Sequence, residues 1–224
     1  PVVAKPRRYF SGDGRVQGKP RILHCREDLN QFLQSENSDD FLFQEFLNGR
    51  SFYLLYHLSK NGPAVRYSQA NLAQQKNGGS ILAAKGAELH HESIADRYEI
   101  LFRQLGFSGL VMVELREARN YFYMIEANPR LWGPSQLFVD ANVPIFRQFF
   151  SDLGFDVPLP TSRREHVQPL YFWLGGFGAK MMTSADFHGG LADQIMDEFR
   201  DYLIHDVYLR PDTLEIFHNE IKNI

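Results

Sequence analysis

The pattern of apolar and polar positions predicts short strands and a few helices up to about residue 155. Runs of β-branched and aromatic residues between turn residues predict strands. These runs cover residues 2–6, 22–25, 41–47, 51–58, 64–68, 109–115 and 121–127. Apolar residues at helical spacing predict three helices. The first begins at Asp28, the second follows a Ser93 N-cap and ends before Gly106, and the third runs from Pro144 to about Leu153.

The order of these elements predicts the fold class and the domain organisation. A strand and a helix come first, followed by hairpins separated by helices, which indicates α+β layers and not a doubly wound parallel sheet. We expect a small subdomain over residues 1–60 and a larger one over 61–155. A C-terminal extension follows over residues 156–224, and its pattern predicts no particular arrangement.

Composition and charge exclude several classes of protein. The 224 residues are 44% hydrophobic and 23% charged, which is typical of a globular chain and not of a disordered one. A net charge of -3 indicates no nucleic-acid partner, and no apolar run approaches the roughly 20 residues of a membrane span. The single cysteine, Cys25, fits a reducing cytoplasm. Because the chain opens on Pro1, without an initiator methionine, we expect a preceding domain to be missing.

A carboxylate interrupts each of two apolar strands near the middle of the chain. Glu114 lies in one strand and Glu126 in the next. Because strand residues alternate faces, Met124, Glu126 and Asn128 are expected on one face. A turn centred on Asn120 would place Glu114 directly opposite Glu126, with their Cβ atoms roughly 4.5–5.5 Å apart.

Two carboxylates so close require a shared proton or a cation between them. With the Asn128 oxygen, they offer three hard oxygen ligands, the set that Mg²⁺ prefers. Two ordinary exposed glutamates on a half-buried hairpin are the alternative. Arg130 follows directly, and a cation beside a carboxylate and amide cluster suits the binding of a phosphate.

A second candidate region lies at the start of the chain. Lys5 sits in the first predicted strand, and a polar stretch with Gly12 and Gly14 follows it. Glycines let backbone amides approach a phosphate closely, and a lysine supplies a point charge for it. A flexible basic loop and a nucleic-acid patch are the alternatives here. Elsewhere, His90 and His91 are adjacent, so in a helix or strand they diverge, and no metal pair is expected.

Taken in order, these segments resemble an ATP-grasp domain over about residues 1–150. Residues 126–136 are most similar to the carbamoyl-phosphate-synthase-like and carboxylate–amine ligase branch. The resemblance is carried by Val2-Val3-Ala4-Lys5-Pro6, the glycine-bearing loop, Gln44-Glu45-Phe46-Leu47-Asn48-Gly49, Gly78-Gly79-Ser80, Met112-Val113-Glu114-Leu115 and Ile125-Glu126-Ala127-Asn128-Pro129-Arg130.

The resemblance implies a nucleotide site between two antiparallel-sheet subdomains. Lys5 would reach the α- and β-phosphates, and the loop with Gly12 and Gly14 would fold over the triphosphate. Ser51 stands where the family often has a glutamate for the ribose hydroxyls. The hinge holding adenine, mainly through backbone groups, would be Gln44, Glu45, Phe46 and Leu47. One or two Mg²⁺ ions, or Mn²⁺ in their place, would be held by Glu114, Glu126 and Asn128.

The resemblance also implies a reaction and its partners. An ATP- and Mg²⁺-dependent ligase would activate a small-molecule carboxylate as an acyl-phosphate for attack by an amine. Arg130 and Lys5 would be its catalytic residues, with Arg130 facing the transferred phosphoryl group. A homodimer and a preceding nucleotide-fold domain are expected. The alternative is a nucleotide-binding module that is non-catalytic or depends on a partner chain.

Overall fold

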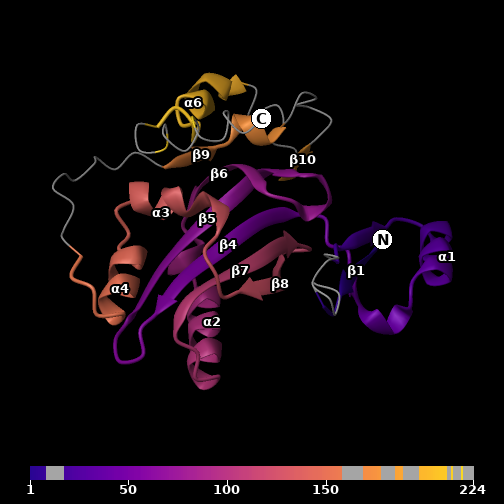
Figure 1. Cartoon of the computed structure of the whole chain (residues 1–224), viewed down its shortest axis with the longest axis horizontal. Coiled ribbons are helices and arrows are strands. Elements are labelled where there is room, and N and C mark those ends of the chain that lie inside the picture. The colour runs from indigo at the N-terminus through magenta and orange to yellow at the C-terminus, as the bar shows by residue number, and fades with distance from the viewer. Residues whose placement is uncertain are drawn as a thin grey trace. The chain divides into compact units, whose positions relative to one another are not determined.

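The computed structural model describes residues 1–8, 18–157, 169–177, 185–188, 197–210, 213 and 218. These residues form two compact units (Figure 1). The small unit comprises Pro1–Asn48 with Lys76–Gly79, and the large unit comprises Gly49–Gln75 with Ser80–Ile224. The division falls after Asn48, earlier than the boundary expected at residue 60, because the next strand pairs within the large unit.

The small unit is a three-stranded antiparallel sheet with one helix packed on it. The strand order is β2-β1-β3. Ala4 and Leu23 from the sheet and Phe32 from the helix form its core. Its elements are β1 (Val2–Pro6), β2 (Arg21–Leu23), α1 (Arg26–Ser35), η1 (Ser38–Asp40), β3 (Phe41–Glu45) and η2 (Lys76–Gly78).

Helix α1 begins at Arg26, before the expected start at Asp28. The Asp28 carboxylate accepts hydrogen bonds from the backbone amides of His24, at 2.8 Å, and Cys25, at 3.3 Å. These bonds, that of His24 first, lower the pKa of the Asp28 carboxyl. Asp28 therefore caps the helix from within its first turn, which places the start of the helix upstream.

The large unit is built on an antiparallel sheet in which most neighbouring strands are also consecutive in the sequence. The strand order is β8-β7-β4-β5-β6-β9, and β10 pairs with β5. The last two strands come from the expected C-terminal extension, so the described part of that segment adds to the large sheet. Its strands are β4 (Arg50–Leu58), β5 (Ala64–Gln75), β6 (Ile81–Ala87), β7 (Gly109–Ala118), β8 (Tyr121–Asn128), β9 (Leu170–Phe172) and β10 (Ala185–Phe187).

The longer helices of the large unit form where the spacing of apolar residues predicts them. Ser93 is the first residue of its helix and Glu92 is the N-cap, which corrects the expected cap. Gly106, with φ of 69°, follows the end of that helix, as predicted. No helix among the described residues combines the length and apolar character that crossing a bilayer requires. The helices are η3 (Leu89–His91), α2 (Ser93–Gln104), η4 (Gly133–Ser135), α3 (Gln136–Asp140), α4 (Ile145–Asp152), η5 (Leu174–Phe177) and α6 (Phe199–Leu203).

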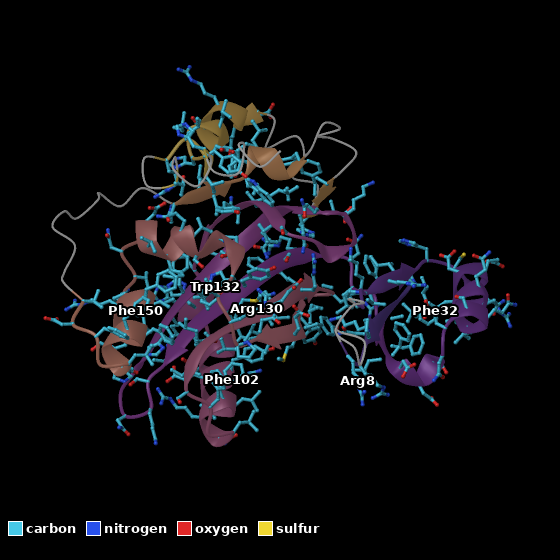
Figure 2. All side chains as sticks on the ribbon, viewed as in Figure 1. Arg8, Phe32, Phe102, Arg130, Trp132 and Phe150 are labelled. Atoms are coloured by element: carbon cyan, nitrogen blue, oxygen red, sulfur yellow. The ribbon has the colours of Figure 1, made fainter. Side chains whose placement is uncertain are left out.

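The two faces of the large sheet carry separate cores. On one face, Leu55 of β4 and Met112 of β7 join a cluster with Trp132, the N-cap of η4, and with residues of α3 and α4. On the other face, Leu54 and its neighbours pack on α2, from which Phe102 points inward (Figure 2). Because side chains alternate along a strand except across a bulge, the strand pairing assigns the polar residues of the sheet to one of these faces.

The core on the α2 face predicts the stability of two variants of one helix. Phe102 is 7% exposed and contacts Tyr56 edge to face, whereas Ile100 of the same helix is 55% exposed. Phe102→Ala should lower the free energy of unfolding by about 3–5 kcal/mol, because it leaves a cavity. Ile100→Ala should change it by less than about 0.5 kcal/mol. Urea denaturation measures both, and equal effects would contradict the packing described.

Candidate metal site

Two carboxylates face each other across the β7–β8 hairpin. Glu114 pairs directly with Glu126, as predicted. The connecting turn consists of Arg119 and Asn120, whose φ values are 53° and 63°. Two residues with positive φ define the type I′ turn that suits a two-residue hairpin. The turn therefore lies between these two residues and is not centred on Asn120.

A β-bulge in β8 brings Glu114 opposite Glu126, a pairing that the two-residue turn alone would not produce. The ladder next to the turn pairs Leu115 with Met124. One step further, an unbroken ladder would pair Glu114 with Ile125 and place Glu126 on the opposite face. A register shift between Glu114 and Leu115 accommodates Ile125 as an extra residue. The predicted face is thus wrong for Met124, which lies opposite Leu115 and does not share the face of Glu126.

Asn128 completes a cluster of oxygen atoms on the same face. It pairs with Met112, one alternate position along β7 from Glu114. Its amide nitrogen donates a hydrogen bond of 2.5 Å to Glu126 Oε1. That bond orients the Asn128 amide, so its carbonyl oxygen is the atom it can offer a cation. Two carboxylates and an amide oxygen are the donors that Mg²⁺ prefers, so these residues fit the predicted ion.

Tyr53 of β4 borders this cluster on the sheet. It pairs with Glu114 and is 7% exposed. Burial raises the pKa of the Tyr53 phenol, and the charges of Glu114 and Glu126 raise that pKa further. Arg116 and Arg130 act in the opposite sense. The phenol therefore stays protonated beside the acids, and two guanidinium groups contribute to the potential at this point.

Arg116 ties the cluster to the segment that follows β10. Its Nη2 donates to Glu114 Oε1 at 3.3 Å, and its Nη1 donates to His188 Nδ1 at 2.9 Å. Burial, followed by the charge of Arg116, lowers the pKa of His188 to about 3. The imidazole is therefore neutral, so Nδ1 accepts and Nε2 donates to Gln74 Oε1 at 3.2 Å. Neither Arg116 nor His188 was predicted, and no spacing in the sequence links them.

Ser51 is buried in the sheet and hydrogen-bonded to a neighbouring strand. It is 1% exposed, and its hydroxyl accepts a hydrogen bond of 3.0 Å from Asn71. Asn71 in turn accepts a hydrogen bond of 2.7 Å from Gln69. This buried row sits on the same face as Glu114, because Ser51 pairs with Arg116 and Gln69 pairs with Tyr53. The ribose contact of Ser51 stays a prediction.

Arg130 lies on the exposed loop after β8, where Figure 2 labels it near Trp132. Its Nη1 donates to the carbonyl oxygen of Leu131 at 3.1 Å. Its charge opposes the rise in the pKa of the Tyr53 phenol, the side chain that borders the two carboxylates. Its catalytic role stays a prediction.

The remaining predicted residues belong to the small unit. Lys5 lies in β1, as expected, and shares a face with Gln44, because Lys5 pairs with Leu42 and Val3 pairs with Gln44. That face is opposite the one that α1 covers. Three further predicted hinge residues end or follow β3, namely Glu45, Phe46 and Leu47. Two others lie outside the described residues, namely Gly12 and Gly14.

Comparison with known proteins identifies the fold. No family model and no curated protein match the sequence. A biotin carboxylase from Campylobacter jejuni, in complex with β,γ-ATP, matches with a TM-score of 0.51 and 15% identity over 71% of this chain and 38% of its own. N5-carboxyaminoimidazole ribonucleotide synthetase from Thermus thermophilus matches with a TM-score of 0.53 and 14% identity, over 70% of this chain and 43% of its own.

A third structure has the same arrangement. The biotin carboxylase domain of 2-oxoglutarate carboxylase from Hydrogenobacter thermophilus, a dimer with MgADP, ADP and bicarbonate, matches with a TM-score of 0.50 and 17% identity, over 71% of this chain and 38% of its own. This chain thus spans about two fifths of the length of these proteins. Its small and large antiparallel sheets with helices form the ATP-grasp fold, as predicted.

The buried imidazole of His188 predicts a pH dependence of stability. Its pKa is about 3 in the folded chain and 6.5 in its ordinary state. Between these values the unfolded chain binds a proton that the folded chain does not, so stability falls as the pH falls through this window. From about pH 7.5 to about pH 5, the wild type should lose roughly 1–2 kcal/mol more than His188→Gln. Urea midpoints at both pH values measure this, and parallel losses would contradict the burial of a neutral ring.

Proposed function

We propose that this chain is the metal- and phosphate-binding part of an ATP-dependent ligase that activates a carboxylate. The single observation that carries the proposal is the pairing of Glu114 with Glu126, with Asn128 on the same face of the hairpin. The ATP-grasp fold supports it, because the C. jejuni and H. thermophilus structures contain β,γ-ATP and MgADP. A structural pair of acids would not need a third oxygen ligand beside it.

Each predicted residue has a role that its charge and position allow. Glu114, Glu126 and Asn128 would hold Mg²⁺, which would neutralise the charge of the phosphates. Lys5 provides a positive charge for the α- and β-phosphates. Arg130, on its exposed loop, stabilises the charge that develops on the transferred phosphoryl group. Backbone groups of the hinge, residues 44–47, hold adenine.

The proposed reaction needs little covalent help from the chain. A substrate carboxylate oxygen attacks the γ-phosphorus, ADP leaves, and an acyl-phosphate forms. An amine then attacks the acyl carbon, and inorganic phosphate leaves. The residues of the chain position these groups and stabilise their charge. The H. thermophilus neighbour, whose structure includes bicarbonate and is a dimer, supports a small carboxylate substrate and a homodimer.

Arg116 and His188 have a positioning role in this proposal. Arg116 holds one oxygen of Glu114, and the neutral ring of His188 holds Arg116 through Nδ1. The Glu114 carboxylate is therefore oriented by a chain of hydrogen bonds that reaches strand β5 at Gln74. Such outer contacts fix the geometry of metal-binding carboxylates.

Two observations favour a second candidate, a nucleotide-binding module without its own chemistry. The Arg116 guanidinium already lies 3.3 Å from Glu114 Oε1, so it competes with a cation for that oxygen. The buried hydroxyl of Ser51 also favours this second candidate. A module of this kind would bind ATP, with or without a partner chain, and would form no ADP.

Glu126→Gln tests the ligase. The substitution removes one negative charge from the metal ligands and keeps the size of the side chain. ADP formation, measured with a panel of carboxylates and amines, should fall by roughly 100-fold or more. Urea denaturation should show little change, because Glu126 lies on a half-exposed face. Glu92→Gln, at an exposed helix cap that makes no side-chain cap bond, is the matched control.

Full activity in Glu126→Gln would remove this carboxylate from the mechanism. Equal losses in both variants would show a general effect of charge and not a metal site.

A thermal shift with ATP separates the ligase from the module. With Mg²⁺ present, ATP at 100 times its Kd should stabilise the wild type by about 2.7 kcal/mol. Without Mg²⁺ the shift should be smaller, because the phosphates and the two carboxylates then repel each other. Stabilisation without ADP formation across the substrate panel would favour the module. No stabilisation by ATP under either condition would contradict both candidates.

A further inference from the structure

We propose that Glu88, His90 and His91 form a binding site for one ion of the zinc class. One ligand atom from each of these residues lies within 4.8 Å of the others. The two imidazole rings are 4.0 Å apart between centroids, and His91 Nε2 lies 3.5 Å from Glu88 Oε2. Two imidazole nitrogens and a carboxylate oxygen form a ligand set that zinc accepts, and water completes the coordination.

The expected divergence of His90 and His91 is wrong because they lie in neither an α-helix nor a strand. They are the last two residues of η3, a single turn of three residues between β6 and α2. Such a short turn does not repeat, so local contacts decide where each ring lies. Ser68 holds the ring of His90, and Glu88 holds the ring of His91.

Ser68 fixes the tautomer of His90 that a metal requires. The Ser68 hydroxyl has one proton, which it donates to the carbonyl oxygen of Ala87 at 2.7 Å. Its oxygen accepts the backbone amide of His90 at 3.1 Å and lies 2.8 Å from His90 Nδ1. With the hydroxyl proton already committed, Nδ1 is the donor in the last contact. His90 Nε2 is then unprotonated and has the lone pair that binds a metal.

The proposed site is accessible and separate from the carboxylate pair. The side chains of His91 and Glu88 are 69% and 87% exposed, so an ion enters without any opening of the fold. The ring of His90 lies beside Tyr67 and Ser68, at the end of the β5–β6 ladder. None of the three ligands lies on the β7–β8 hairpin, so the zinc-class site does not depend on the proposed ligase activity.

The chemistry of the ligands predicts selectivity between metals. Imidazole nitrogen suits Zn²⁺, Ni²⁺ and Cu²⁺, whereas Mg²⁺ prefers oxygen ligands. Zn²⁺ should therefore bind at this site when Mg²⁺ is in excess. An ion bridging Glu88 and the two histidines would fasten η3 to the edge of the sheet ahead of α2, and would stabilise the chain against heat.

The test is a Zn²⁺ titration of tag-free chain, in excess Mg²⁺, against a chromophoric chelator. One equivalent should bind, and His91→Ala should weaken binding by at least about ten-fold. Ser68→Ala, which removes only the orienting hydroxyl, should weaken it by roughly 10–100-fold. His24→Ala, next to the exposed Cys25, is the control and should bind as the wild type does. Nitrogen-15 NMR of the imidazoles should show His90 protonated at Nδ1 before zinc is added.

Several results would overturn the proposal. Absence of stoichiometric binding at micromolar Zn²⁺ would do so, and so would unchanged binding in a variant that combines His90→Ala with His91→Ala. Loss of binding in His24→Ala alone would assign the ion to the Cys25 region. Zn²⁺ should also raise Tm in the wild type and not in His91→Ala, whose exposed side chain contributes little to the fold.

Discussion

The repulsion between Glu114 and Glu126 is the constraint on which the rest of the site depends. Two carboxylates held opposite each other on adjacent strands disfavour the fold unless positive charge or a proton offsets them. Arg116 and the Asn128 amide supply part of that compensation within the chain. A bound cation would supply more, which is why we propose a metal ion at this pair.

On one face of the large sheet, the apolar residues that stabilise the fold and the polar residues of the candidate site occupy neighbouring rows. Leu55 and Met112, in one row, belong to the apolar cluster with Trp132, α3 and α4. Tyr53 and Glu114, in the next row, mark the change to polar side chains, and Ser51 continues it. Glu126 can therefore be replaced without opening the core, whereas Arg116 also offsets the charge of Glu114. Acids placed among the apolar rows would carry a desolvation cost that no ligand could offset.

The sequence predicted the elements that local pattern controls. The strands that contain Glu114 and Glu126 and the helix ending before Gly106 follow from alternation and spacing. The bulge at Ile125 was not predictable, because a shift of one residue leaves the apolar pattern of β8 unchanged while it reverses the face. The contact of Arg116 with His188 joins segments far apart in the sequence, and pairing over that distance leaves no periodic signal.

The most direct test of the central claim is a crystal structure of the chain with MnADP, using the anomalous signal of manganese to locate the ion. The account predicts one manganese peak bound by oxygens of Glu114, Glu126 and Asn128, with a phosphate oxygen completing its coordination. A manganese peak on other residues, or a nucleotide bound elsewhere while Glu114 stays paired with Arg116, would contradict it.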